Sequence, residues 1–351
     1  MKAMVMAAGV GSRLMPLTEE IPKPMIPMAN RPLMENIVDL LKKHNFDQII
    51  ANLHYHADGI SQYFGDGSRF GVNLFYSREE ELMGTAGGVK KCAWFLDDTF
   101  VIVSGDALTD ADLGRLMQEH KKKGALATIA LKRVAEVENF GIVITDSDGL
   151  ITSFQEKPRA DQALSNYANT GIYIFEPEIF NYIPARKFYD FGKQVFPQLV
   201  KIQAPFYGAD IGSYWCDVGN IDTYRQSHAD ILQGLVDVPV QGKKSVNPKH
   251  IVLVGEGCKI GDEVEFQGSV VIGPRTEIQN GAVISDAVVW NDTVVKNGTI
   301  LDNCVVGAHC CLEKSVAVNR GAVIASGCTL ESHSVIPPQQ RVDRYPHCTN
   351  Y

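Results

Sequence analysis

Residues 301–330, LDNCVVGAHCCLEKSVAVNRGAVIASGCTL, place an apolar side chain at every sixth position. The series runs through Val306, Leu312, Val318, Ile324 and Leu330. One inward apolar residue per step of six is typical of a β-helix built from hexapeptide repeats, in which three steps complete one coil. The pattern therefore predicts a β-helix in this part of the chain.

The same step of six extends toward the N-terminus. Before a slip in phase, the apolar positions are Val254, Ile260, Phe266, Ile272, Ile278 and Ile284. After the slip, the step of six resumes at Val288, Val294 and Ile300. Two positions before each apolar residue the side chain is usually small or β-branched, whereas Asp286 and Asp292, beside the slip, break this rule. We expect about four coils over 251–332, followed by a cap or tail over 333–351.

Residues 1–235 have a different rhythm, in which short apolar runs alternate with amphipathic stretches. The expected strands are Ala3–Ala7, Gln48–Asn52, Asn73–Tyr76, Phe100–Ser104, Ala127–Leu131, Gly141–Thr145 and Gly171–Phe175, and the expected helices are Pro32–His44, Asp110–Lys123 and Ile221–Leu235. This order predicts an α/β domain with a Rossmann-like, mostly parallel sheet covered by helices. Residues 236–250 would be a linker. In such sheets ligands bind at the carboxyl ends of the strands.

Composition narrows the function classes. A chain of 351 residues can hold two domains, and its net charge of −8 speaks against a nucleic-acid-binding surface. No apolar run approaches the roughly 20 residues of a membrane span, and no signal peptide is evident, so we expect a cytoplasmic protein without membrane contact. The eight cysteines form no Cys-x-x-Cys pair and are interpreted as reduced, mostly buried thiols.

The first expected strand leads directly into a glycine-rich loop. Gly9 and Gly11 let backbone N–H groups approach a phosphate, and Arg13 adds a planar cation. The loop alone could equally be a tight turn without a ligand, and it lacks both the Gly-Lys-Ser/Thr of a P-loop and a third glycine in dinucleotide spacing. Lys23, however, follows closely between Pro22 and Pro24, which restrict its backbone. We therefore expect Lys23 to bind phosphate together with the loop.

Six blocks of the chain, taken in order, resemble the sugar-phosphate nucleotidyltransferases. They are AAGVGSRL (7–14) with PKP (22–24), GTAG (84–87), SGD (104–106), FQEKP (154–158), NTGIY (169–173) and WCDVG (215–219). The resemblance covers essentially the whole chain and is closest to mannose-1-phosphate guanylyltransferases that carry a C-terminal hexapeptide-repeat domain. It implies a GT-A-like nucleotidyltransferase domain followed by a left-handed parallel β-helix.

The resemblance also implies a reaction and a set of site residues. An oxygen of a sugar 1-phosphate attacks the α-phosphate of a nucleoside triphosphate and pyrophosphate leaves, a step that depends on positioning and charge neutralisation. The implied catalytic residues are Arg13, Lys23, Asp106, Lys157 and Asp217. The implied nucleotide contacts are Ala7, Ala8, Gly9, Gly11, Ser12, Arg13, Glu81, Gly84, Thr85 and Ala86, and the implied sugar-phosphate contacts are Gly141, Glu156, Lys157, Asn169 and Thr170.

A metal site agrees with the residues themselves. Asp106 follows the apolar strand Phe100–Ser104, and Asp217 follows a second apolar turn. Two carboxylates brought together at the sheet edge would suit Mg²⁺, which prefers oxygen ligands and keeps waters and substrate phosphates. A helix cap or turn is the alternative for either aspartate alone. We expect Mg²⁺ to be the cofactor, held by Asp106 and Asp217.

The acidic run Glu79-Glu80-Glu81 precedes the second glycine motif and is expected to line the base pocket. Guanine offers two neighbouring donors to a carboxylate, whereas uracil and thymine offer one N–H between carbonyls. The run therefore favours GTP, with mannose 1-phosphate as the sugar substrate, although Leu82-Met83 replaces the Pro-Leu that is more usual in the family.

Other functions stay open. One alternative is glucose 1-phosphate with UTP or dTTP, and another is a non-catalytic, regulatory protein that binds the nucleotide-sugar. A hexapeptide acyltransferase using His309 would leave the N-terminal domain without a role. The flat faces and ends of a β-helix can mediate self-association, so we expect a homo-oligomer.

Overall fold

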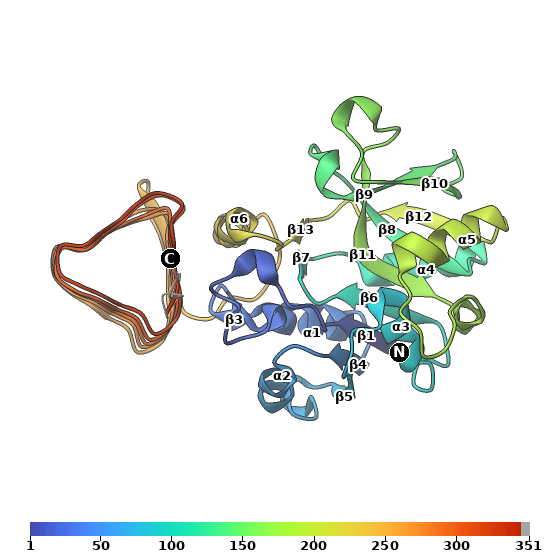
Figure 1. The fold of residues 1–351 in the computed structure, drawn as a ribbon, viewed down its shortest axis with the longest axis horizontal. Helices are drawn as coiled ribbons and strands as arrows, with labels where there is room; N and C mark the ends of the chain where they lie inside the picture. The colour runs from blue at the N-terminus through green and yellow to red at the C-terminus, as the bar shows by residue number, and fades with distance from the viewer. Residues whose placement is uncertain (345–351) are drawn as a thin grey trace, which may run out of the picture. The chain divides into compact units, whose positions relative to one another are not determined.

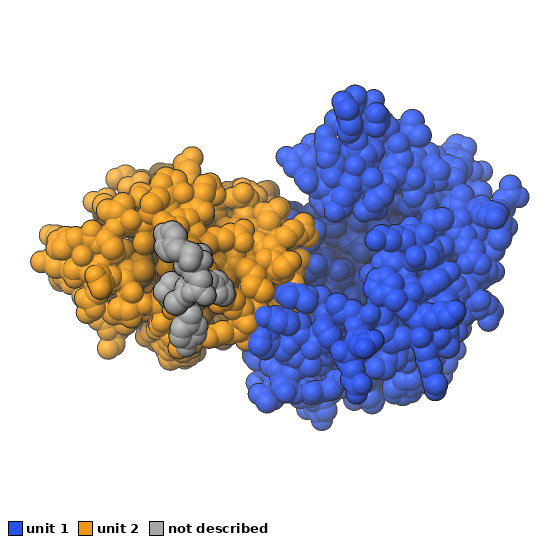
Figure 2. All heavy atoms as spheres, viewed as in Figure 1, with its two compact units in different colours: residues 1–10, 34–217 blue, residues 11–33, 218–351 orange. Residues whose placement is uncertain are grey.

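In the computed structural model, residues 1–344 are described and the chain divides into two compact units, coloured separately in Figure 2. Unit 1 consists of Met1–Val10 and Met34–Asp217, and unit 2 consists of Gly11–Leu33 and the chain from Val218 onward. This division differs from the expected one near residue 235. The N-terminal segment Gly11–Leu33 groups with the C-terminal half because it hydrogen-bonds to residues beyond 218, as described below.

Unit 1 is built on a nine-stranded sheet. Its strands are β1 (Lys2–Met6), β4 (Gln48–Leu53), β5 (Asn73–Arg78), β6 (Phe100–Ser104), β8 (Ala127–Arg133), β9 (Gly141–Thr145), β10 (Ile151–Glu156), β11 (Tyr167–Phe175) and β12 (Phe206–Asp210). The order is β10-β9-β11-β6-β1-β4-β5, with β8 paired to both β11 and β12. All seven expected strands are confirmed. The sheet is mixed, because β11 runs antiparallel to β6, β8 and β9.

The helices are α1 (Leu33–Lys43), α2 (Ala57–Phe64), α3 (Gly84–Lys91), α4 (Leu113–Lys123), α5 (Phe196–Lys201) and α6 (Ile221–Gln233). The boundaries of α4 follow from local chemistry, because the Asp112 carboxylate accepts the backbone N–H of Arg115 and Gly124 ends the helix with φ 56°. Within residues 1–344, none of the helices combines the length and the apolar character that crossing a membrane requires.

The register of the parallel strands determines where the functional loops emerge. Met6 of β1 pairs with Asn52 of β4 on one side and with Ser104 of β6 on the other. The residues that follow these strands therefore leave the sheet at one edge, where the carboxyl ends of parallel strands meet. Ala7 and Asp106, both expected in the site, are among them.

In unit 2 the C-terminal half forms a parallel β-helix, whose stacked triangular coils are seen end-on in Figure 1. Its strands are β15 (His250–Val254), β16 (Lys259–Ile260), β17 (Glu265–Ile272), β18 (Glu277–Ile278), β19 (Val283–Ser285), β20 (Val288–Val289), β21 (Val294–Val295), β22 (Ile300–Asp302), β23 (Val305–Val306), β24 (Cys311–Leu312), β25 (Ala317–Val318), β26 (Val323–Ile324), β27 (Thr329–Leu330), β28 (Val335–Ile336) and β29 (Arg341–Val342). The predicted left-handed parallel β-helix is confirmed.

The inward phase after the slip differs from the expected one by a residue. Leu301 is 0% exposed, whereas its neighbour Ile300, the expected inward residue, is 49% exposed. The spacing between successive inward residues is instead five, not six, at two places: between Ile284 and Val289 and between Leu301 and Val306. All four of these residues are buried. The sequence pattern was ambiguous here because two apolar residues stand side by side at these positions.

Both ends of the β-helix extend beyond the expected limits. Upstream, β14 (Lys243–Val246) lies in the expected linker and pairs antiparallel with β15. Downstream, β28 pairs with β25 and β29 pairs with β26, so the ladder continues past residue 332 to Val342. The expected cap is thus partly a further stretch of coil, and residues 345–351 lie outside the described residues.

The phase of the interior is testable with two adjacent substitutions. Leu301→Ala removes a fully buried side chain and should lower the free energy of unfolding by about 2–5 kcal/mol, because it leaves a cavity. Ile300→Ala, the matched control, should cost less than about 1 kcal/mol. Denaturant titration of both variants checks this, and equal losses would contradict the observed phase.

Candidate active site

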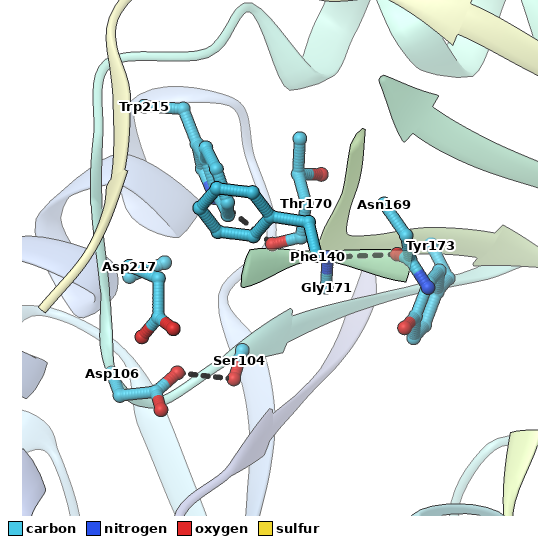
Figure 3. Close-up of a pocket in the computed structure, with 10 residues that line it drawn as sticks. Ser104, Asp106, Phe140, Asn169, Thr170, Gly171, Tyr173, Trp215 and Asp217 are labelled. Atoms are coloured by element: carbon cyan, nitrogen blue, oxygen red, sulfur yellow. Dashed lines mark hydrogen bonds between the residues drawn. The ribbon is translucent and has the colours of Figure 1, made fainter. Parts of the chain in front are cut away.

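A pocket of about 200 Å³ lies at the carboxyl edge of the sheet in unit 1. It brings together side chains from four separate stretches of the chain, among them Asp106, Phe140, Asn169, Trp215 and Asp217 (Figure 3). Four of the residues expected in the site, Asp106, Asn169, Thr170 and Asp217, therefore line one pocket.

Two short strands bring the two aspartates together. In the antiparallel pair β7 (Ala107–Thr109) and β13 (Trp215–Asp217), Asp217 lies opposite Ala107, the residue next to Asp106. Figure 3 shows the two carboxylates turned toward each other, with Asp106 Oδ1 accepting a hydrogen bond of 2.5 Å from Ser104 Oγ. The intervening Gly105 is required by a close approach, since a Cβ there would lie 2.6 Å from the carbonyl oxygen of Met6.

A bulge in β11 forms the polar wall of the pocket. The pairing of β11 with β8 shifts register between Asn169 and Tyr173. The Asn169 side chain accepts the N–H of Gly171 and contacts the hydroxyl of Tyr173, whose pKa is raised by burial. The Thr170 hydroxyl donates to Ala130 O at 2.7 Å. The hydroxyl proton of Thr170 is therefore used within the protein, and the expected sugar contact of this pocket-lining residue stays a prediction.

An aromatic pair lies beside the bulge and forms another wall of the pocket. The rings of Phe140 and Trp215 meet edge to face with centroids 5.4 Å apart. Trp215 Nε1 donates to Thr170 O at 2.9 Å, which fixes the indole against the bulge. A pocket with apolar faces and a few oriented polar groups is typical of small-molecule sites. Phe140 was missed from the sequence, although it stands directly before Gly141 of the expected sugar pocket.

Three further residues expected to bind the sugar phosphate lie next to this aromatic wall. Gly141 of β9 pairs with Glu156 of β10, and the Lys157 backbone N–H donates to Phe140 O at 3.1 Å. Lys157 has φ 46°, an unusual conformation for a lysine that often marks functional positions. The side chains of Glu156 and Lys157 are exposed. Phe140 thus links this pair to the pocket.

A buried hydrogen-bond chain that was missed from the sequence joins the loop after β1 to the loop after β5 through Asn52 of β4. Asn52 Oδ1 accepts the backbone N–H of Ala7 at 3.0 Å, and Asn52 Nδ2 donates to Glu79 Oε1 at 2.7 Å. Glu79 Oε2 in turn accepts the N–H of Met83. Glu79 is therefore a structural member of the acidic run, whereas Glu81 remains exposed and is held in the same loop.

The start of α3 is packed against a neighbouring loop. Tyr189 O accepts the N–H groups of Ala86 and Gly87, and the Thr85 hydroxyl donates to Asp190. Gly84, with φ 73°, is required because a Cβ there would lie 2.5 Å from Tyr189 O. The Thr85 hydroxyl and the Ala86 N–H are thus used within the protein, and the expected nucleotide contacts of these two residues stay a prediction.

In unit 2, the glycine loop and the lysine motif are in direct contact. Gly11 has φ 72°, and a Cβ there would lie 2.8 Å from Lys23 Cβ, so the lysine stem occupies the space beside the glycine. Thr18 Oγ1 donates to Gly11 O at 2.9 Å, and Arg13 lies in the 3₁₀ turn Ser12–Leu14 that begins at Gly11. Lys23 is 6% exposed. Lys23 therefore lies beside the loop, and its binding of phosphate stays a prediction.

The donor set at Asp106 and Asp217 fits a magnesium ion. Within residues 1–344 no group of three or more His, Cys, Asp and Glu side chains is placed to bind a metal. Two carboxylates that share a pocket suit Mg²⁺, which commonly takes one or two protein carboxylates and completes its shell with waters and phosphates. They suit Zn²⁺ poorly, because that ion prefers a closed set of nitrogen and sulfur ligands.

Comparisons with known proteins agree with the two-part organisation of the chain. The nucleotidyl transferase family model matches residues 2–234, and the model of the GMPPB C-terminal domain matches residues 248–345. A UTP–glucose-1-phosphate uridylyltransferase of Synechocystis is 41% identical, covering 83% of this chain and 83% of the relative. A mannose-1-phosphate guanylyltransferase of Mycobacterium tuberculosis is 32% identical over 82% of this chain and 79% of the relative.

A solved structure extends the likeness to three dimensions. A putative glucose-1-phosphate thymidylyltransferase from Bacillus anthracis, in complex with a sucrose, has a TM-score of 0.59 and 25% identity, covering 65% of this chain and 94% of that one. The fold is thus shared with a protein named as a sugar-1-phosphate nucleotidyltransferase. The chain belongs to the sugar-phosphate nucleotidyltransferase family.

The buried chain through Glu79 is testable by an isosteric change. Glu79→Gln replaces one acceptor oxygen with an NH₂ group that must face Asn52 Nδ2 or the N–H of Met83. Thermal and denaturant unfolding should show a loss of about 1–3 kcal/mol, because a buried donor is left unsatisfied. Glu80→Gln, an exposed control on the next residue, should be neutral. A neutral Glu79→Gln would show that the chain of hydrogen bonds contributes little.

Proposed function

We propose that the protein is a mannose-1-phosphate guanylyltransferase, which converts GTP and mannose 1-phosphate to GDP-mannose and pyrophosphate. The observation that carries this choice is the exposed Glu81, which lies in the loop closed by the hydrogen bond from the Met83 N–H to Glu79, and Glu79 is joined through Asn52 to Ala7 at the start of the glycine loop. A carboxylate there can accept both neighbouring donors of guanine. The guanylyltransferase relative and the match to the C-terminal domain model support the same choice.

In the proposed reaction, an oxygen of the sugar 1-phosphate attacks the α-phosphorus in line, the bond to the β-phosphate breaks, and pyrophosphate leaves with the electron pair. Arg13 and Lys23 would bind the triphosphate together with the backbone of the glycine loop, including Gly9, Gly11 and Ser12. Lys157 would bind the phosphate of the incoming sugar. Such a step needs no side-chain nucleophile, because positioning and charge neutralisation provide the catalysis.

Asp106 and Asp217 would hold the magnesium ion, which supplies charge neutralisation at the reacting phosphates when bound. Ser104 orients one of these carboxylates through its hydrogen bond to Asp106 Oδ1. Asn169 and Gly141 with Glu156 would bind the sugar beside the aromatic pair, and Phe140 and Trp215 would exclude water from the attacking phosphate.

A second candidate substrate pair is UTP with glucose 1-phosphate. It is favoured by the relative that is 41% identical over most of both chains, a glucose-1-phosphate uridylyltransferase. A non-catalytic regulatory role is disfavoured, because all five expected charged catalytic residues are present in the chain. A cytoplasmic location and self-association through the β-helix stay predictions.

The metal role is testable at Asp217. Asp217→Asn keeps the size of the side chain but removes its charge, so Mg²⁺-dependent pyrophosphate release should fall at least about a hundredfold while the unfolding midpoint stays within a few degrees. Asp112→Asn is the matched control, since asparagine caps α4 as well as aspartate does. Full activity of Asp217→Asn would remove Asp217 from the metal site.

The substrates are testable with a grid of four nucleoside triphosphates against mannose, glucose and related sugar 1-phosphates, reading pyrophosphate. GTP with mannose 1-phosphate should give the highest kcat/KM. Glu81→Gln should lower kcat/KM for GTP by about tenfold or more and leave UTP unchanged, because only guanine loses an acceptor for its paired donors. Glu80→Gln serves as control. A wild-type preference for UTP and glucose 1-phosphate would support the second candidate instead.

A further inference from the structure

The segment that carries Arg13 and Lys23 is anchored to the β-helix. This segment, Gly11–Leu33, is called here the signature segment; it contains a 3₁₀ turn at Lys23–Met25 and the small hairpin of β2 (Pro27–Met28) with β3 (Arg31–Pro32). It forms one compact unit with α6 and the coils of the β-helix. Hydrogen bonds to residues beyond 218 hold it near both of its ends.

One anchor is the last strand of the β-helix. From β29, the guanidinium of Arg341 donates to Met15 O at 2.7 Å through Nη1 and to Arg13 O at 3.3 Å through Nη2. The planar fork of an arginine can reach two carbonyls at once, and its charge strengthens both hydrogen bonds. Three residues further on, Arg344 forms an ion pair of 2.6 Å with Glu20. This second pair is exposed and contributes less.

The other anchor holds the hairpin of the signature segment. Tyr224 of α6 donates its hydroxyl to Pro27 O at 2.6 Å, and Trp290 Nε1 donates to the same hydroxyl at 2.9 Å. Asn30 Nδ2 donates to Ile272 O at 3.0 Å, directly onto a β-helix strand. Tyr224 and Trp290 are buried. The hairpin is therefore fixed to the β-helix by a buried aromatic pair.

Between these anchors lie the groups assigned to the triphosphate. The two acceptors of Arg341 are the carbonyl of Arg13 itself and that of Met15, so the guanidinium sets the backbone of the turn that follows Gly11. Gly11 in turn packs against the stem of Lys23. A change in the last coil of the β-helix would thus move Arg13 and Lys23 together.

We propose that Arg341 is a positioning residue for nucleoside triphosphate binding, through which the last coil of the β-helix keeps the signature segment in its binding conformation. This proposal rests on the proposed function, because it takes Arg13 and Lys23 as triphosphate ligands. It gives the β-helix a role in substrate binding in addition to any part in self-association. A consequence is that a ligand or partner bound at the last coil would change triphosphate affinity.

The test uses the full chain with Arg341→Ala, Arg341→Lys and a control, Arg320→Ala. Arg320 is exposed in the same final stretch of the β-helix, and its backbone oxygen, which the substitution keeps, accepts the N–H of Gln339. Titration calorimetry with GTP and with UTP, each with Mg²⁺, should show affinity for the better triphosphate falling about tenfold in Arg341→Ala. Arg341→Lys keeps the charge but loses the planar two-donor group, so its triphosphate affinity should lie between those of Arg341→Ala and the wild type. The affinity of Arg320→Ala should match that of the wild type.

Two further readouts separate positioning from general damage. In steady-state kinetics, kcat/KM for the triphosphate should fall about tenfold in Arg341→Ala while KM for the sugar 1-phosphate stays within about twofold. Amide hydrogen exchange should speed up in residues 11–26 and stay unchanged across the coils of residues 265–312. Equal losses for both substrates, or faster exchange throughout the β-helix, would overturn the proposal.

The outcomes also distinguish this proposal from the proposed function. A wild-type chain that binds neither GTP nor UTP would overturn the function and the positioning role together, before any variant is made. A wild type that binds a triphosphate, with Arg341→Ala binding it equally well, would overturn the positioning role and leave the function standing.

Discussion

The contact between Gly11 and the stem of Lys23 is the constraint on which the conformation of the signature segment depends. Only a residue without a side chain fits there, because Gly11 has φ 72° and a Cβ would lie 2.8 Å from Lys23 Cβ. The contact folds the signature segment back on itself, so that a 3₁₀ turn bearing Arg13 and another beginning at Lys23 belong to one packed structure. The hydrogen bond from Thr18 to Gly11 O closes the same turn.

The pocket in unit 1 also depends on a close backbone contact at a glycine. Parallel pairing places the ends of β1, β4 and β6 at one edge, and Gly105 allows the chain after β6 to touch Met6 O. Asp106 therefore emerges beside the end of β1, and the short β7–β13 pair brings Asp217 to it from more than a hundred residues away. The carboxylates are positioned by strand geometry, whereas the indole of Trp215 is held by a side-chain hydrogen bond to Thr170 O.

Much of the fold follows from local patterns, and the exceptions have physical causes. The six-residue repeat predicted the β-helix, and the short apolar runs between amphipathic stretches predicted the seven sheet strands. Both patterns arise because burial requires apolar side chains at regular positions. The inward phase around Leu301 was misjudged because Ile300 beside it is equally apolar. The strands at Val335 and Arg341 escaped notice because outward residues and prolines dilute the repeat in the last coil.

The site was only partly predictable for a related reason. Motif residues such as Asp106, Asn169 and Lys23 can be recognised in the sequence by their residue type and by the residues next to them. Partners that orient them, including Asn52 for Ala7 and Arg341 for Arg13, are distant in sequence and ordinary in type, so only the folded chain reveals them. Glu79 shows the converse. Its place in an acidic run suggested base binding, whereas both of its carboxylate oxygens accept hydrogen bonds from other residues of the protein.

The central claim is that the packed signature segment binds the nucleoside triphosphate. The most direct measurement is calorimetric binding of GTP and UTP, each with Mg²⁺, to the wild-type chain and to Gly11→Ala, with circular dichroism as a check on folding. We predict that Gly11→Ala keeps the wild-type secondary structure and loses most of the triphosphate affinity, because the new Cβ must displace Lys23. A folded Gly11→Ala chain that binds the triphosphate as tightly as the wild type would contradict it.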